Sequence, residues 1–218
     1  MHDQIIRIHR ALPQTQCQRC GYPDCLSYAQ AIVEDQAPIN QCPPGGAEGI
    51  DRLAEITGQA VAPLNPENGF EGPLTVAYID ENWCIGCTLC IKACPTDAII
   101  GTNKHMHTVI ESECVGCELC IPACPVDCIE LEPVNPNTSG WAAWSQAQAD
   151  HALQRYEARQ KRLKREAIEH DERLAAKAQS KLADLEQASL HTEPAVLDQK
   201  RAIIEAALAR AKARQQQR

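Results

Sequence analysis

Short apolar patterns separated by turn residues characterise the start of the chain. Apolar positions three or four residues apart predict short helices over residues 3–12, 25–35 and 47–57. Asp24 is a suitable N-cap for the second helix, and Gly58 is a suitable stop for the third. These features predict a small helical domain.

The pattern changes after residues 59–73, a Pro-, Gly- and Asn-rich stretch that we interpret as a linker. Short alternating apolar segments then predict four strands, with turn residues between the middle two. Strands that close on themselves in this way predict a compact, pseudo-symmetric α+β unit. The expected strands are 75–79, 98–100, 108–110 and 129–131.

Residues 141–218 are rich in Ala, Gln, Lys, Arg and Glu. Over residues 141–190 apolar side chains recur at spacings of three, four and seven, which predicts a long amphipathic helix. His191–Pro194 interrupts this pattern, and a second helix is expected to follow. We interpret the six basic residues within 155–165 as a solvated helix face in preference to a membrane contact.

Two cysteine runs with the same spacing lie 30 positions apart between these segments. Both read C-x2-C-x2-C-x3-C-P, the spacing of bacterial ferredoxins with two [4Fe–4S] clusters, in which the fourth cysteine of each run ligates the other run's cluster. The sequence therefore predicts crossed ligand sets. One is Cys84, Cys87, Cys90 and Cys124, and the other is Cys94, Cys114, Cys117 and Cys120.

Zinc and disulfides fit this doubled run less well than two clusters do. Structural zinc uses paired C-x2-C units with longer gaps, and disulfides are disfavoured because nothing marks the chain for export. Cys128 is left over and aligns with Ala98 of the first run, so we interpret it as a small buried apolar residue. His105 and His107 are expected to be exposed turn residues, not metal ligands.

Four further cysteines lie in the first helical segment, with the spacing C-x2-C-x4-C-x16-C. Four thiolates around one helical hairpin suit a third [4Fe–4S] cluster, and by spacing alone they also suit zinc. The candidate ligands are Cys17, Cys20, Cys25 and Cys42.

Charge is divided unevenly along the 218 residues. The net charge is −8, but residues 1–140 contribute −12 and residues 141–218 contribute +4. An acidic first part favours basic protein partners and argues against nucleic acid. The chain shows no export signal and no apolar run near the roughly 20 residues that span a bilayer, so we expect a cytoplasmic protein.

With the cysteines placed, the chain resembles the B subunit of the Rnf (also called Rsx) electron-transport complex. The resemblance covers residues 1–135 and rests on three motifs: Leu12-Pro-Gln-Thr-Gln-Cys17-x2-Cys20-Gly-Tyr-Pro-x-Cys25, Ile39-Asn-x-Cys42-Pro-Pro-Gly-Gly46, and the doubled ferredoxin run. It implies that the first four cysteines bind a [4Fe–4S] cluster. It also implies electron exchange between low-potential ferredoxin and NAD, coupled to ion movement, on the cytoplasmic face of a membrane.

Members of the family that the chain resembles usually begin with a transmembrane helix. Here 16 residues precede Cys17, and they are too few and too polar to span a bilayer, so no N-terminal membrane helix is expected. Any membrane association is expected to be peripheral, on the cytoplasmic face of the inner membrane.

The expected fold class is therefore α+β, in three parts joined by the linker. A helical [4Fe–4S] domain covers residues 1–58, a bacterial-type 2[4Fe–4S] ferredoxin domain covers 74–135, and a helical charged tail covers 141–218.

The expected function is electron transfer through three [4Fe–4S] clusters, with no catalytic acid, base or nucleophile of the chain's own. The expected partners are redox proteins: other Rnf/Rsx subunits, ferredoxin or flavoprotein oxidoreductases. The alternatives are a free soluble ferredoxin that serves cytoplasmic reductases, a redox or iron sensor acting through the tail, and a zinc-only interaction module.

Overall fold

The computed structural model describes residues 2–216, and the side chains of residues 188 and 214–216 lie outside the description. Its parts are a compact unit that ends at residue 159 and a helical unit that begins at residue 160. Met1 and residues 217–218, which the predicted first domain and tail include, lie outside the described residues. The division into three domains stays a prediction.

Three short helices form the N-terminal helical domain, residues 2–58: α1 (His2–Ala11), α2 (Cys25–Val33) and α3 (Gly46–Thr57). They agree closely with the predicted helices. The Asp24 side chain accepts a hydrogen bond from the Ser27 N–H at 2.7 Å, and Gly58 ends α3 in the left-handed conformation, with φ of 73°. Buried side chains of all three helices form the core. They include Ile8, Leu12, Tyr28, Ile32 and Leu53.

The linker contains a 3₁₀ turn, η2 (Pro66–Asn68), and another, η1 (Pro43–Gly45), precedes α3. Glu71, near the end of the linker, accepts hydrogen bonds from the Ala47 N–H at 3.0 Å and from the Ser139 hydroxyl at 2.7 Å. A carboxylate at the first turn of α3 is favourable because the helix N-terminus carries partial positive charge. One linker side chain therefore joins α3 to the segment that leaves the strands.

Two antiparallel strand pairs form the ferredoxin domain, residues 74–135. Strand β1 (Thr75–Ile79) pairs with β4 (Ile129–Pro133), and β2 (Ile99–Ile100) pairs with β3 (Thr108–Val109). Helix α4 (Leu89–Ala93) follows the first cysteine loop, and η3 (Glu111–Glu113) precedes the second. The predicted strands are confirmed, with β4 two residues longer than expected. The core between the pairs consists of cysteines with isoleucine and alanine side chains.

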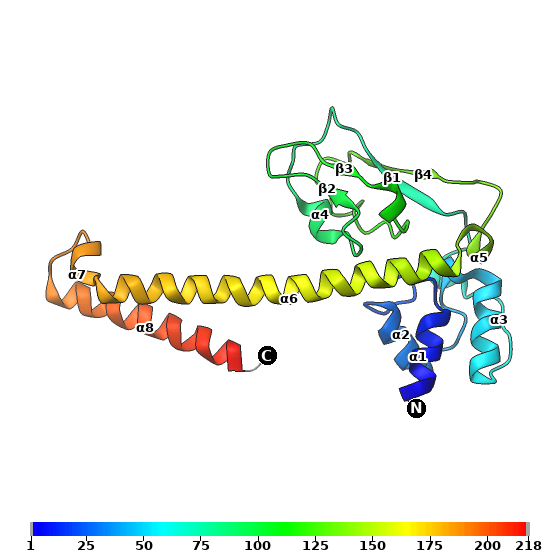
Figure 1. Ribbon diagram of the computed structural model, residues 1–218, viewed down its shortest axis with the longest axis horizontal. Coiled ribbons are helices and arrows are strands. Elements are labelled where there is room, and N and C mark those ends of the chain that lie inside the picture. The colour runs from blue at the N-terminus through cyan, green and yellow to red at the C-terminus, as the bar shows by residue number, and fades with distance from the viewer. Residues whose placement is uncertain (1, 217–218) are drawn as a thin grey trace. The chain divides into compact units, whose positions relative to one another are not determined.

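After the strands come α5 (Gly140–Ala143) and the long helix α6 (Gln146–Ala183). The start of α6 lies against both cluster-binding domains (Figure 1). The Trp144 indole N–H donates to the Pro13 carbonyl at 2.9 Å, and Tyr156 donates to Asp24 at 3.3 Å. Trp141 and Trp144 are buried with Val115 and Cys117 of the ferredoxin domain. The compact unit thus continues past residue 141, to residue 159.

Two arginines attach α6 to the ferredoxin domain. Arg155 donates to the Thr96 carbonyl at 2.9 Å and pairs with Glu113 at 3.0 Å. Arg159, whose side chain is 9% exposed, pairs with Asp97 at 2.8 Å and also bonds the Lys92 carbonyl. The sequence-based interpretation of residues 155–165 as a solvated face is therefore wrong for these two residues, because their partners come from a distant part of the chain.

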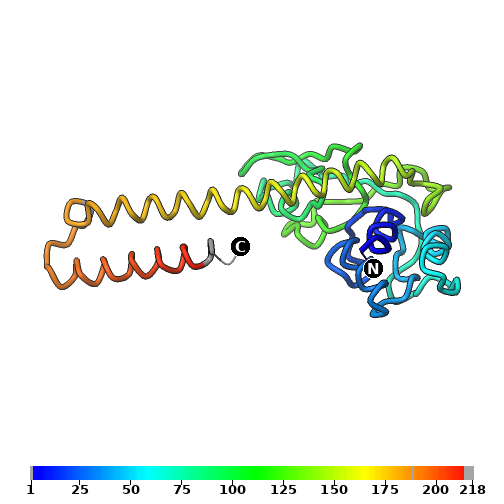
Figure 2. Tube along the Cα trace, turned by 60° about the horizontal axis from the view of Figure 1, so that its bottom comes forward, coloured from blue at the N-terminus to red at the C-terminus, as the bar shows by residue number. Residues whose placement is uncertain are grey.

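The second unit holds the rest of α6, α7 (Leu185–Ala188) and α8 (Pro194–Gln216). Within it the chain reverses direction at α7, and α8 runs back antiparallel to α6 (Figure 2). The predicted break before Pro194 is confirmed. Its ion pairs, such as Arg162–Glu166 at 2.8 Å, are exposed and one helical turn apart. No helix within residues 2–216 is long and apolar enough to cross a membrane.

Arg159→Ala should lower the free energy of unfolding by about 2 kcal/mol, because it removes charge-assisted hydrogen bonds to Asp97 and to a backbone carbonyl. The measurement is anaerobic urea unfolding followed by circular dichroism. Arg201→Ala is the matched control and should cost under about 0.5 kcal/mol, since its exposed ion pair with Asp198, one turn away on α8, contributes little. Equal losses in the two variants would contradict the anchoring role of Arg159.

Candidate metal centres

The first cysteine set lies in the N-terminal helical domain and forms site 1. Its four cysteines line one cavity together with Leu12 and Tyr28. Cys25 begins α2, and Cys42 precedes η1. The members of site 1 are Cys17, Cys20, Cys25 and Cys42.

Glutamines hold the loop that carries Cys17. Gln14, Gln16 and Gln18 all have positive φ, between 53° and 62°, which is unfavourable for residues other than glycine. Two buried bonds maintain this backbone: Gln16 donates to the Gln14 side chain at 2.9 Å, and the Cys25 N–H donates to Gln16 at 3.0 Å. Left-handed backbone conformations at every second residue of this loop turn successive N–H groups toward one side. This arrangement suits an anionic cluster.

Each ferredoxin run supplies three cysteines to one cavity and the fourth to the other. Cys94 lies just after α4, which directs the chain from the first cavity to the second. The ligand candidates that line site 2 are Cys84, Cys87, Cys90 and Cys124. Those that line site 3 are Cys94, Cys114, Cys117 and Cys120.

The two loops share one backbone shape. Gly86 and Thr88 have φ of 67° and 65°, and Gly116 and Glu118 have φ of 62° and 64°. A Cβ on Gly86 would lie 2.5 Å from the His105 backbone nitrogen, and one on Gly116 would lie 2.6 Å from the Thr75 carbonyl oxygen. Glycine is thus required by positive φ and by close backbone approach.

Backbone N–H groups point at sulfurs in both ferredoxin sites. The Ala98 N–H donates to Cys94 at 3.2 Å, and the Cys128 N–H donates to Cys124 at 3.4 Å in the equivalent position. The Ala77 N–H donates to Cys114 at 3.4 Å. Such bonds stabilise negatively charged sulfur, so the backbone is arranged for thiolates.

Burial makes the metal-free thiols weak acids. It raises the pKa of Cys117 and Cys120 to about 12 and that of Cys90 to about 11, and it also raises the pKa of Cys25 and Cys42. These groups therefore hold their protons at neutral pH unless a cation replaces them. Iron supplies that positive charge, so cluster binding releases protons and stabilises the fold.

A single metal ion and a [4Fe–4S] cluster require different arrangements of the four thiolates. A mononuclear zinc site brings its thiolates within about 2.3 Å of one point, whereas a [4Fe–4S] cluster holds each thiolate at a separate iron. Within residues 2–216 no group of three or more His, Cys, Asp or Glu side chains is arranged to hold one metal ion. The donor set of each site, four cysteine thiolates that line one cavity, fits a cluster.

The sequence-based assignment of the two histidines is half wrong. His105 is exposed as expected, but His107 is only 1% exposed, and its Nδ1 lies 3.3 Å from the Cys90 sulfur in site 2. A comparison of the two repeats would have indicated this, since His107 lies 30 residues after Ala77, an inward-facing strand position. Cys128 is buried as predicted, and its sulfur lies 3.5 Å from that of Cys124.

Fold and sites together define an iron–sulfur protein with a small cluster domain followed by a dicluster ferredoxin domain. Two protein families match these parts: "Putative Fe-S cluster" matches residues 12–44, and "4Fe-4S dicluster domain" matches residues 77–131. The protein is thus an iron–sulfur electron-transfer protein that binds [4Fe–4S] clusters, as expected.

Curated relatives identify the protein family more specifically. A protein of Azoarcus sp. named as the B subunit of an ion-translocating oxidoreductase complex is 61% identical over 137 residues, which is 63% of this chain and 75% of the relative. Proteins of the same name from Alkalilimnicola ehrlichii and Thiobacillus denitrificans are 53% and 56% identical, over 78% and 57% of their lengths. The chain belongs to this family of ion-translocating oxidoreductase complex B subunits, which confirms the resemblance.

The crossed ligand sets predict paired effects. Cys84→Ser and Cys124→Ser should each damage the same cluster, because their sulfurs line the same cavity, while Cys94→Ser should damage the other. The measurement is electron paramagnetic resonance of the reduced protein, with iron and acid-labile sulfide counted on the same samples. If Cys94→Ser gives the spectrum of Cys84→Ser, the crossed assignment is refuted.

Proposed function

We propose that this chain relays single electrons through three [4Fe–4S] clusters as a subunit of a membrane-associated oxidoreductase complex, with site 3 between sites 1 and 2. The observation that carries the proposal is the presence, in one compact unit, of three cavities, each lined by all four cysteines of one predicted ligand set. Bound clusters would supply one-electron storage, and the chain would position and insulate them.

The contacts between domains support this order. Cys17 of site 1 packs against the buried group that contains Val115 and Cys117 of site 3. Arg19, between the ligands of site 1, forms an ion pair with Glu118, which lies between the ligands of site 3. Site 2 is lined by residues of the ferredoxin domain, and its Cys90 belongs to the same buried cluster as Cys120 of site 3.

Helix α6 keeps sites 1 and 3 together. Tyr156 reaches Asp24 in the N-terminal helical domain, and Arg155 on the same helix reaches Glu113 beside Cys114. Electron transfer between fixed centres depends on an unchanging separation, so a rigid helix that contacts both domains serves a relay.

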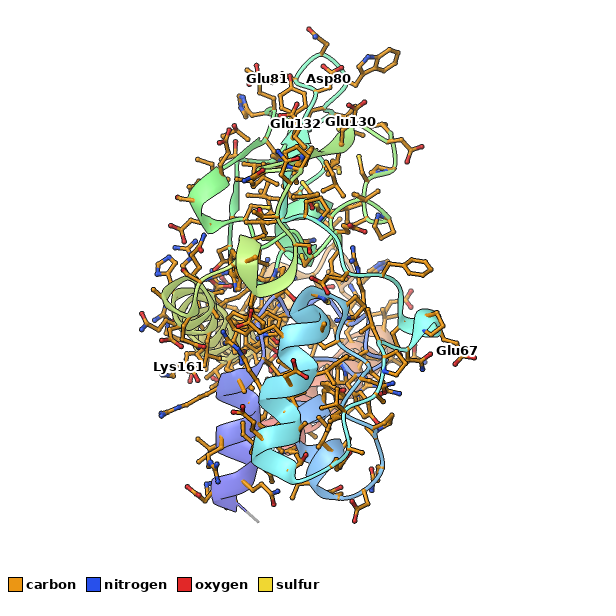
Figure 3. All side chains as sticks on the ribbon, turned by 90° about the vertical axis from the view of Figure 1, so that its right-hand side faces the viewer. Glu67, Asp80, Glu81, Glu130, Glu132 and Lys161 are labelled. Atoms are coloured by element: carbon orange, nitrogen blue, oxygen red, sulfur yellow. The ribbon has the colours of Figure 1, made fainter. Side chains whose placement is uncertain are left out.

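Four acidic side chains gather near site 2. Asp80 and Glu81 follow β1, Glu130 and Glu132 lie on β4, and all four lie at one end of the ferredoxin domain (Figure 3). Ile79 and Ile129, their chain neighbours, line site 2. We propose that a redox protein with basic side chains docks here, because opposite charges accelerate productive encounter.

A pull-down tests membership of a complex. Tagged full-length protein, with three clusters verified as about twelve irons per chain, should recover integral membrane proteins from detergent-solubilised membranes under anaerobic conditions. Recovery of soluble oxidoreductases alone would contradict membership and favour the free ferredoxin. A cluster count below three would contradict the relay even if membrane proteins were recovered.

Glu130→Gln with Glu132→Gln should slow electron exchange with a basic redox partner about threefold at low ionic strength and less at high salt, because steering is electrostatic. Stopped-flow absorbance measures the second-order rate. Asp51→Asn with Glu55→Gln removes the same charge from exposed positions of α3 and should leave the rate unchanged. Equal slowing by both pairs would show that only net charge matters.

A further inference from the structure

The two halves of the ferredoxin domain are related by a 30-residue offset in structure as well as in sequence. Ile79 pairs with Ile129 and Tyr78 with Glu130; thirty residues away, Val109 pairs with Ile99 and Thr108 with Ile100. The offset can therefore be used to compare the surroundings of site 2 and site 3 position by position.

The first difference between the two halves lies at the next position along the paired strands. Ala77 pairs with Leu131 and lines site 3, whereas the equivalent residue of the other half, His107, lines site 2. The equivalent of Leu131 is Gly101, and a Cβ on Gly101 would lie 2.2 Å from His107 Cδ2. The missing side chain at Gly101 makes room for the imidazole, so the position is built for a ring of this size.

His107 acts on a ligand sulfur. It is 1% exposed, and its Nδ1 lies 3.3 Å from the sulfur of Cys90. A cysteine that ligates iron is a thiolate and has no proton to give, so the imidazole Nδ1–H is the donor in this contact.

The second difference is at the leftover cysteine. Cys128 lines site 2, and Ala98 occupies the equivalent place in site 3. The Cys128 sulfur lies 3.5 Å from that of Cys124, so its S–H donates to the ligand thiolate. The Cys128 N–H donates to Cys124 at 3.4 Å, and the Ala98 N–H donates to Cys94 at 3.2 Å. The two equivalent positions therefore differ only in their side chains.

Site 3 gains no comparable side-chain donor from its nearest hydroxyl. The Thr96 hydroxyl lies 3.8 Å from Cys94, but it donates its proton to the Glu113 carbonyl at 2.8 Å. The ligands of site 3 are also well buried, with Cys94, Cys117 and Cys120 between 5% and 9% exposed. Site 3 has backbone donors to Cys94 and Cys114, but burial without a side-chain donor opposes the extra negative charge that reduction brings.

We propose that His107 and Cys128 raise the midpoint potential of the cluster in site 2 above that of the cluster in site 3. Hydrogen bonds to ligand sulfurs withdraw negative charge and favour the reduced cluster. When the two ferredoxin clusters share one electron, that electron then resides mainly on the cluster in site 2. The cluster in site 3 is oxidised as the cluster in site 2 is reduced. Asp80 and Glu81 act in the opposite direction, but solvent screens them. The inference rests on the crossed ligand sets proposed above.

His107→Leu in the full-length, cluster-loaded protein tests this, because leucine fills a similar volume without a donor. The partition of one electron between the two ferredoxin clusters should move about tenfold toward site 3, a shift of about 59 mV in their potential difference. Redox titration followed by electron paramagnetic resonance measures both potentials, and the signal altered by Cys84→Ser identifies site 2. His107→Gln, which keeps an N–H donor, should restore part of the shift.

His105→Leu is the matched control, since it removes an exposed histidine from the same hairpin, and it should change neither potential. Unchanged potentials in His107→Leu, or a shift confined to site 3, would overturn the proposal. If His107→Leu loses a cluster, Cys128→Ala decides, because alanine already fits the equivalent position of site 3. It should lower the potential of site 2 alone, and no change would overturn the proposal.

Failure of the ligand assignment has a different signature. It would appear in the unsubstituted protein as an iron and sulfide count short of three clusters, or as Cys84→Ser and Cys124→Ser altering different signals. A wrong role for His107 and Cys128 would leave those results intact and change only the potentials.

Discussion

Ligation of iron by buried cysteine thiolates is the interaction on which the rest of this structure depends. In the ferredoxin core, ligand cysteines are buried together with isoleucine and alanine side chains. Burial that raises the thiol pKa values makes a charged sulfur costly without a cation and favourable with one. Cluster binding would therefore contribute to the stability of the fold. Near site 1 several glutamines have positive φ, and near sites 2 and 3 glycines do. These backbone conformations are tolerated because they shape the loops that carry the cysteines.

A second constraint is the fixed relation between the cluster-binding domains. The segment from the end of α5 into α6 contributes Trp144, Tyr156 and Arg159, each bonded to a different part of the chain. Buried hydrogen-bonded groups such as the Trp144 indole and the Arg159 guanidinium hold this junction more firmly than exposed ion pairs do. The helix that composition alone assigns to a separate tail is, in its first turns, a structural part of the relay.

The function of the ferredoxin domain depends on the similarity of its two halves and on the positions where they differ. Both halves use the same loop shape, the same strand register and the same backbone donors to sulfur. Identical halves would hold two equivalent clusters and give an electron no preferred position. His107 and Cys128, which stand where the other half has Ala77 and Ala98, change the sulfur environment without altering the backbone.

The sequence by itself determined the local features of this protein. Cysteine spacing specified the ligand candidates, and Asp24, Gly58 and the strand at residues 75–79 were predictable, because caps, turns and alternation depend on neighbouring residues. Only the tertiary structure decided that His107 is buried beside Cys90 and that Arg155 and Arg159 bond the ferredoxin domain. Their partners are 17 to 67 residues away, and a polar side chain near a turn is indistinguishable from an exposed one until those partners are placed around it.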